Sequence, residues 1–289
     1  MYAIMGITGR VGGATARALL NEGKKVRGIV RDPSKAASWE AAGAELAVAD
    51  WNDPTALEAA LSGVEGVFVM IPPNFAPAPG YPETRQIVAG LRQALDAARP
   101  PKVVYLSSVG AQHPSGLGLI TQLHILEQEL GALSIPTAFI RPAWFLENFQ
   151  SDVASARDEG EIASFLHPPD RKLPMVATED IGRLAGKVIQ EQWAGNRRLE
   201  LEGPERYSQF DAAETFSRLL GRPVRLKLIP RQAWPALFEA QGMAADRTAP
   251  RIEMLDGFNS HWIDFERNGT ESFRGSRTQE EVFQDLLQR

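Results

Sequence analysis

The chain has 289 residues, 44% of them hydrophobic, which is enough to bury the core of one large α/β domain or of a main domain with a smaller lobe. Lysine and arginine number 31 against 36 acidic residues, and the formal charge of −5 argues against direct binding of nucleic acid. The absence of cysteine excludes disulfides, thiolate metal sites and a cysteine nucleophile. Because the start MYAIM is too short for a signal peptide and no apolar run approaches the roughly 20 residues of a membrane span, we expect a cytoplasmic protein without a membrane partner.

The first 142 residues alternate short apolar runs with segments of helical spacing. Val11, Ala14 and Ala18 recur at the spacing of one helix face. Asp53 followed by Pro54 marks a helix start, with an N-cap residue and then a proline in the first turn. Repeated strand and helix units joined by right-handed crossovers predict a doubly wound α/β domain with a parallel sheet over residues 1–142. The predicted strands are residues 2–5, 25–30, 44–49, 66–71, 102–107 and 136–141.

Residues 143–289 differ in pattern, and we expect them to form a smaller mixed α/β lobe with segments that cross back to the first domain. Residues 178–189 predict a capped amphipathic helix, and residues 278–289 predict a second one at the end of the chain. Residues 167–174 are expected to form a loop. The proline-rich residues 72–82 follow a predicted strand end and are expected to form a mobile loop over the site.

A glycine motif follows the first predicted strand and opens the first predicted helix. Gly6, Gly9 and Gly12 form GxxGxxG. A dinucleotide-binding turn needs glycines for its backbone angles, for close approach of a pyrophosphate and for packing of helix on strand. The helix N-terminus offers free N–H groups and a partial positive charge to the phosphates, so we expect a Rossmann-type cofactor domain. The alternative is a tight turn that binds no ligand. The predicted contacts of this turn are Gly6, Thr8, Gly9, Arg10, Val11 and Gly12.

The end of the second predicted strand bears on the choice between NAD and NADP. Arg31 lies about 20 residues beyond the glycines and Lys35 follows it, so the two side chains can hold a 2′-phosphate. Asp32 keeps NAD open, because an acidic residue at this place pairs with the ribose hydroxyls of NAD. We therefore favour NADP(H), and the alternative is that these residues are solvated charges at a helix start.

Later strand ends supply further predicted cofactor contacts. Asp50 and Trp51 follow the third strand and are placed to border the adenine, although a capped turn with a packed indole fits the same residues. Ile71 and Pro72 end the fourth strand and are expected on the ribose side. Ser107, at the end of the fifth strand, completes the predicted set.

Six short motifs of the chain belong together: TGRVGG (8–13), VRDPSK (30–35), ADWNDP (49–54), LSSVGA (106–111), IRPAWFLENF (140–149) and VATEDIGRLA (176–185). They resemble those of the NmrA-like family of atypical short-chain dehydrogenase/reductases, and the resemblance spans essentially the whole chain. It implies an NAD(P)-binding protein that either reduces quinones or related acceptors or binds the dinucleotide as a regulatory signal.

The resemblance also implies a serine at the end of the fifth strand and a Tyr and Lys pair, four residues apart, on the next helix. Ser107 and Ser108 are at the strand end, but Leu119 and Leu123 occupy the tyrosine and lysine places. Leucine transfers no proton, and general acid–base catalysis is worth roughly 10² to 10⁴ in rate, so alcohol dehydrogenation is disfavoured. The catalytic residues are therefore unknown, with His124 and Ser107 as weak candidates. A hydrogen bond at a domain boundary is the alternative role for His124.

Aromatic residues after the sixth strand are expected at the sheet edge where α/β proteins bind ligands. They can wall a flat acceptor pocket, and the alternative is that they pack between the domains. No histidine has metal-ligand spacing with acidic residues, so no metal is expected. The predicted pocket residues are Tyr81, on the proline-rich loop, with Trp144, Phe145, Asn148 and Phe149.

Two functions remain from the sequence. The first is an NADP(H)-binding oxidoreductase that passes hydride to a quinone-like or other conjugated acceptor, because such a small molecule stabilises the incoming hydride and can take its proton from water. The second is a redox-sensing regulator that binds NAD(P) and a protein partner without catalysis. A sugar-nucleotide epimerase or dehydratase ranks below both, because it would need the missing tyrosine and lysine.

Overall fold

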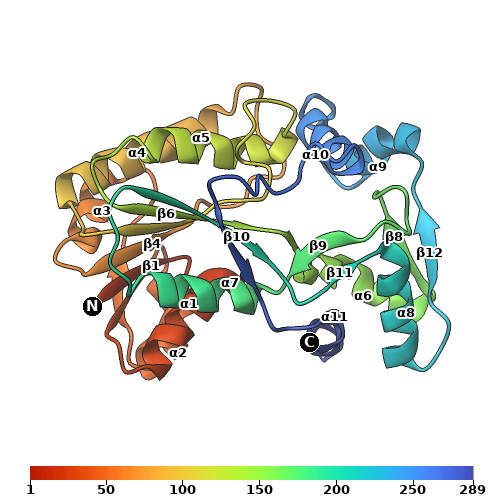
Figure 1. Ribbon diagram of the computed structural model, residues 1–289, viewed down its shortest axis with the longest axis horizontal. Coiled ribbons are helices and arrows are strands. Elements are labelled where there is room, and N and C mark those ends of the chain that lie inside the picture. Colours follow the sequence, from red (N-terminus) through yellow and green to blue (C-terminus); the bar gives the residue numbers. More distant parts are fainter. Residues whose placement is uncertain (289) are drawn as a thin grey trace.

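An eight-stranded parallel sheet runs through the centre of the computed structural model, which describes residues 1–288 (Figure 1). Its strands are β1 (Tyr2–Met5), β2 (Val26–Val30), β3 (Glu45–Val48), β4 (Gly66–Val69), β5 (Val103–Leu106), β6 (Thr137–Pro142), β10 (Asn196–Glu202) and β13 (Glu271–Arg274). They lie in the order β13-β10-β6-β5-β4-β1-β2-β3. The chain therefore winds outward from β1 in both directions, which confirms the predicted doubly wound α/β class.

Helices cover both faces of this sheet. They are α1 (Arg10–Asn21), α2 (Ala37–Ala41), α3 (Pro54–Leu61), α4 (Pro82–Ala98), α5 (Thr121–Leu130) and α7 (Thr178–Val188). α3, α4 and α5 lie on one face, and α1, α2 and α7 lie on the other (Figure 1). Leu57, Leu91 and Leu126 belong to the buried cluster of the first face, whereas Leu19 and Leu184 belong to that of the second. Removing these apolar faces from water stabilises the three layers.

A third buried cluster holds the segments that lie beyond the end of the main sheet. They include β7 (Trp144–Phe145), β8 (Glu161–Ser164), β9 (Leu173–Val176), β11 (Arg206–Tyr207), β12 (Arg225–Leu228), α6 (Val153–Asp158), α8 (Gln209–Leu220), α9 (Trp234–Ala240), α10 (Ala249–Asn259) and α11 (Gln279–Leu287). β11, β9 and β7 form one small sheet, and β12 pairs with β8 in another. β10, β13 and α7 follow residue 142 but lie in the layers of the main sheet, so the division at that residue stays a prediction.

Two predicted helix starts are confirmed in atomic detail. The Asp53 carboxylate accepts a hydrogen bond from the N–H of Ala56 at 3.0 Å, and α3 begins at the adjoining proline. Thr278 and Glu281 cap the start of α11 reciprocally, each side chain accepting from the other residue's N–H. Arg289, the last residue of that predicted segment, lies outside the described residues.

Two local predictions need correction. α7 is helical as expected, but its N-cap Ala177 gives no side-chain hydrogen bond. The N–H of Thr178 instead donates to Glu147, from a distant segment, at 2.9 Å. The loop predicted over residues 167–174 is wrong at its end, because β9 begins at Leu173 and pairs with β11 and β7. Within residues 1–288, no helix has both the length and the apolar composition needed to cross a bilayer.

We expect Asp152, just before α6, to make the free energy of unfolding depend on pH. Its burial raises the pKa of this carboxyl to about 6, so the folded chain holds the proton more tightly than the unfolded chain does. The resulting stabilisation is complete below about pH 4 and is lost as the pH rises through about 6. Asn keeps an acceptor for the N–H of Ala163, which donates to Asp152 at 3.1 Å. An Asp152→Asn variant should therefore be about 3 kcal/mol more stable than the wild type at pH 7.5, with little difference at pH 4.

Urea unfolding at the two pH values measures this difference. Asp158→Asn, at an exposed residue of the same helix, is the matched control and should show neither effect. A wild-type protein that is the more stable of the pair at pH 7.5 would contradict the prediction.

Candidate functional site

The glycine motif lies in the turn from β1 to α1, near the middle of the sheet. Gly6 has a φ of +66°, in the left-handed region that favours glycine. The N–H of Gly9 donates to the carbonyl oxygen of Gly6 at 2.8 Å. A Cβ atom on Gly12 would lie 2.2 Å from that same oxygen. The turn is therefore folded tightly on itself and has no space for a side chain at Gly12.

The N-terminus of α1 fits a bound anion. Its N-cap is Gly9, which has no side chain to accept a hydrogen bond, and the first turn holds no acidic residue. Uncapped N–H groups and the helix dipole favour a phosphate at this place. Thr8 and Gly9 are exposed, so a ligand can reach the turn from solvent. These residues fit the pyrophosphate of a dinucleotide, and their part in binding it stays a prediction.

Two predicted contacts of this turn are placed to offer their backbone rather than their side chains. Val11 is only 3% exposed and packs in the core under α1. The Arg10 guanidinium donates to Gln150, in the 3₁₀ segment before α6, at 3.3 Å. The backbone N–H groups of Arg10 and Val11 nevertheless lie in the uncapped first turn of the helix.

Two of the charged side chains that follow β2, those of Arg31 and Lys35, are positive and exposed. Asp32 accepts hydrogen bonds from the hydroxyl and the N–H of Ser34, at 2.6 and 3.0 Å, and these bonds hold the pKa of Asp32 below its usual value. The Lys35 side chain is 78% exposed, and its ammonium group lies 3.9 Å from the Asp32 carboxylate. Arg31 is exposed and has no ion pair with any residue from 1 to 288. Asp32 is thus occupied in a local cap, while Arg31 and Lys35 can meet a 2′-phosphate.

The other predicted cofactor contacts lie at neighbouring strand ends. Asp50 accepts hydrogen bonds from the N–H and the side-chain amide of Asn52, each at 2.9 Å, which makes a capped turn. Trp51 is half-buried against the cluster beneath α3 and α4. Ile71 and Pro72, just after β4, are also half-buried. Contacts of these four residues with adenine or ribose stay predictions.

Ser107 follows β5 and is held by a buried ion pair. Its hydroxyl donates to the Glu127 carboxylate, on α5, at 2.5 Å. Arg141 of β6 donates to both oxygens of that carboxylate, at 2.8 and 2.6 Å, and also to Glu266 at 2.7 Å. Ser107, Glu127 and Arg141 are 4%, 7% and 2% exposed. Glu127 and Arg141 were not predicted from the sequence, although an arginine in the mostly apolar strand 136–141 was an available signal.

The predicted catalytic helix carries His124, one ring nitrogen of which hydrogen-bonds to the backbone. His124 Nδ1 lies 2.8 Å from the carbonyl oxygen of Ala111, in the loop after β5. A carbonyl oxygen only accepts, so the hydrogen is on Nδ1, and Nε2 is free to accept in the neutral ring and to donate in the charged one. Leu119 is 7% exposed and Leu123 is half-buried, so the two residues at the tyrosine and lysine places pack rather than react.

The predicted pocket residues do not share one environment. Phe149 is 5% exposed and packs on Phe283 with ring centroids 5.0 Å apart, which is the core role left as an alternative. Trp144 is half-buried in an edge-to-face contact with Phe258, also at 5.0 Å. Phe145 packs beside the core under α1 and α7, whereas Asn148 is exposed.

Tyr81 hydrogen-bonds the proline-rich loop to the short 3₁₀ segment that precedes α5. Its hydroxyl donates to the carbonyl oxygen of Gly118 at 2.8 Å, and its burial raises the pKa of the phenol. Gln122 of α5 donates to the backbone oxygen of Asn74, in the same loop, at 2.9 Å. The structure therefore places this loop against α5, and the role of Tyr81 in an acceptor pocket stays a prediction.

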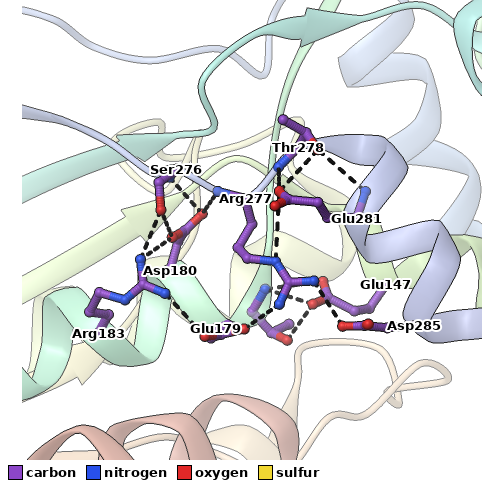
Figure 2. A network of polar contacts seen from close by, with 10 residues as sticks. Glu147, Glu179, Asp180, Arg183, Ser276, Arg277, Thr278, Glu281 and Asp285 are labelled. Atoms are coloured by element: carbon purple, nitrogen blue, oxygen red, sulfur yellow. Dashed lines mark hydrogen bonds and ion pairs between the residues drawn. The ribbon is translucent and has the colours of Figure 1, made fainter.

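On the face of the sheet that α1 and α7 cover, a polar network joins α7 to the C-terminal residues 276–285 (Figure 2). The Asp180 carboxylate accepts from the N–H groups of Ser276 and Arg277, each at 3.0 Å. The Arg277 guanidinium donates to Glu179 at 2.6 Å and to Asp285 of α11 at 2.8 Å (Figure 2). A charged cavity of about 90 Å³ lies beside it, lined in part by Arg10 and Arg17. The network holds residues 275–278, which connect β13 to α11.

Among residues 1–288, no three or more His, Asp or Glu side chains gather in an arrangement that would hold a metal ion. The predicted absence of a metal stays a prediction.

Comparisons with known proteins agree on family and fold. The NAD(P)H azoreductase of Xenophilus azovorans is 26% identical over 243 residues, covering 84% of this chain and 82% of that protein. Quinone oxidoreductase 2 of Escherichia coli (strain K12) is 25% identical and covers 84% of this chain and 82% of its own length. The NADPH complex of the quinone oxidoreductase QOR2 from E. coli superposes with a TM-score of 0.76, at 23% identity over 99% of each chain.

The triphenylmethane reductase of Citrobacter sp. has the same fold, with a TM-score of 0.80 at 19% identity over 100% of this chain and 99% of its own. The family model described as NmrA-like matches residues 2–254. With its glycine turn at the centre of a doubly wound sheet, this chain belongs to the NmrA-like family.

Proposed function

We propose that this protein is an NADPH-dependent reductase of quinone-like or other conjugated acceptors. The observation that carries the proposal is the uncapped N-terminus of α1 behind a turn too tight for a side chain at Gly12. Arg31 and Lys35 are exposed after the adjoining strand and favour NADP over NAD. The relatives named as an azoreductase and a quinone oxidoreductase support the same class of reaction.

The side chains of this site suit binding and orientation better than proton transfer. The N–H groups of α1 bind the pyrophosphate, and Arg31 and Lys35 bind the 2′-phosphate. The bound cofactor supplies the hydride. Leu119, just before α5, and Leu123, on α5, leave this segment without the usual acid. The acceptor must therefore itself stabilise the added charge, as a quinone does, and take its proton from water.

Oxidation of NADPH by a panel of quinones and azo dyes tests the proposal, with NADH in parallel and heat-denatured protein as the control. Consumption of NADPH that depends on both the acceptor and the folded protein is the expected result. No consumption above background with any acceptor would contradict it.

A redox-sensing regulator is the second candidate, and the packed leucines at the tyrosine and lysine places favour it. Such a protein binds the dinucleotide and a protein partner without turnover. Pull-downs with and without NADPH distinguish the two functions. A partner captured only in one cofactor state, together with no turnover, would favour the regulator.

His124→Asn tests whether an acid is needed. Asn can still donate to the carbonyl oxygen of Ala111, as His124 does at 2.8 Å, but it lacks the free Nε2. We expect kcat for a quinone to stay within about fivefold of the wild type, because general acid catalysis contributes little to an acceptor that stabilises hydride itself. Steady-state kinetics at saturating NADPH measure this. A loss of about 100-fold would instead make His124 the proton donor.

A further inference from the structure

The hydroxyl of Ser107 can only donate, and not accept, in its hydrogen bond with Glu127. Arg141 keeps its protons at any working pH and donates to both oxygens of the Glu127 carboxylate. Both oxygens therefore accept, and the 2.5 Å contact between Ser107 and Glu127 must carry its hydrogen on the serine oxygen. A hydroxyl has one hydrogen, so Ser107 has none left to give.

The hydroxyl hydrogen of the neighbouring Ser108 is also used in a hydrogen bond. The Ser108 hydroxyl donates to the carbonyl oxygen of Val109 at 3.0 Å. The N–H of Ser107 donates to Ile140 of β6 at 2.8 Å, which fixes the serine backbone as well. The two serines that follow β5 thus have hydroxyl lone pairs to offer but no free hydroxyl hydrogen.

We propose that Glu127, clamped by Arg141, is a positioning residue that makes Ser107 a hydrogen-bond acceptor for the bound cofactor. A quinone carries carbonyl acceptors and no donor, so a hydroxyl with no free hydrogen cannot hold it. The carboxamide of a nicotinamide ring has an NH₂ group that donates, and the crevice at the carboxyl ends of the strands is where such a ring lies in this fold. Ser107 therefore contacts the cofactor rather than the acceptor. The inference rests on the proposed function.

Keeping this ion pair buried is costly, which supports a specific role for it. Removing two charges from water costs several kcal/mol per ion, and apolar side chains of similar volume often stabilise a fold equally well. Here the pair links β5, α5 and β6 at the point where the sheet ends. It fixes both the position and the direction of one hydroxyl.

The first test is Ser107→Ala, with the Kd for NADPH from calorimetry and kcat for 1,4-benzoquinone at saturating NADPH. Loss of one neutral hydrogen bond should raise the Kd about fivefold and leave kcat within about threefold. A kcat lower by about 100-fold would overturn the inference, because that is the cost of losing a donor to a developing oxyanion. An unchanged Kd would also overturn it. A wild-type protein that does not bind NADPH would instead defeat the proposed function.

The second test is Glu127→Gln, alone and combined with Ser107→Ala. If Glu127 acts through Ser107, the double variant should show about the same rise in the Kd for NADPH as either single variant, rather than the product of the two. Glu129→Gln, an exposed residue on the same helix, is the matched control and should leave the Kd unchanged. Independent, multiplying effects would show that Glu127 only supports the fold. If Glu127→Gln does not fold, Ser107→Ala decides the inference.

Discussion

A Gly12→Ala variant is expected to bind NADPH about 100-fold more weakly than the wild type, because a clash of this size costs about 3 kcal/mol. The added Cβ would lie 2.2 Å from the carbonyl oxygen and 2.5 Å from the carbonyl carbon of Gly6. The turn can relieve this contact only by moving its own backbone, and that movement displaces the N–H groups of α1. Calorimetric titration with NADPH, at a temperature where the variant is folded, measures the loss.

Gly186→Ala is the control for this prediction. Its Cβ would lie 2.9 Å from the Cβ of Ala18, where α7 packs on the later part of α1, away from the glycine turn. Both variants should unfold at lower temperature than the wild type, but only Gly12→Ala should lose the cofactor disproportionately. A folded Gly12→Ala protein with wild-type affinity would contradict the placement of the pyrophosphate.

Replacing Arg31 and Lys35 together by alanine should change the choice of cofactor. Hydrogen bonds to charged groups contribute about 1.5–3 kcal/mol, so the Kd for NADPH should rise about 10- to 100-fold. The Kd for NADH should stay the same, because NADH has no 2′-phosphate. Arg92→Ala, at an exposed arginine paired with Glu129, controls for loss of surface charge. Equal weakening of both cofactors, or a wild-type preference for NADH, would contradict the roles of Arg31 and Lys35.

The architecture follows from patterns that are local in sequence. The spacing of Val11 and Ala14 gives one face of α1, and both side chains are buried there. Asp53 and Thr278 mark helix starts through bonds to residues three positions away. Such signals are readable because each partner lies within one helical turn. The parallel order of the central strands then follows from the repeated crossovers.

The parts that escaped prediction depend on partners far apart in the chain. α7 is capped by Glu147, from 31 positions earlier. β13 joins the sheet beside β10, and β9 pairs on both sides within a small sheet, because tertiary contacts and not local pattern select these strands.

In the candidate site too, features that depend on neighbouring residues could be predicted, and features that depend on distant residues could not. The glycine turn was readable because its constraint on backbone space falls within residues 6–12. The direction of the Ser107 hydroxyl was not, because it depends on Glu127 and Arg141, from α5 and β6. Phe149 and Asn148 are neighbours in sequence, yet one lies in the core and the other is exposed. A run of aromatic residues does not reveal which side chains face the ligand.

Calorimetric titration of the wild-type protein with NADPH and then with NADH tests whether the glycine turn binds a dinucleotide. The uncapped N-terminus of α1 and the exposed Arg31 and Lys35 predict saturable binding of NADPH and weaker binding of NADH. A folded protein that binds neither cofactor at millimolar concentration would contradict the account.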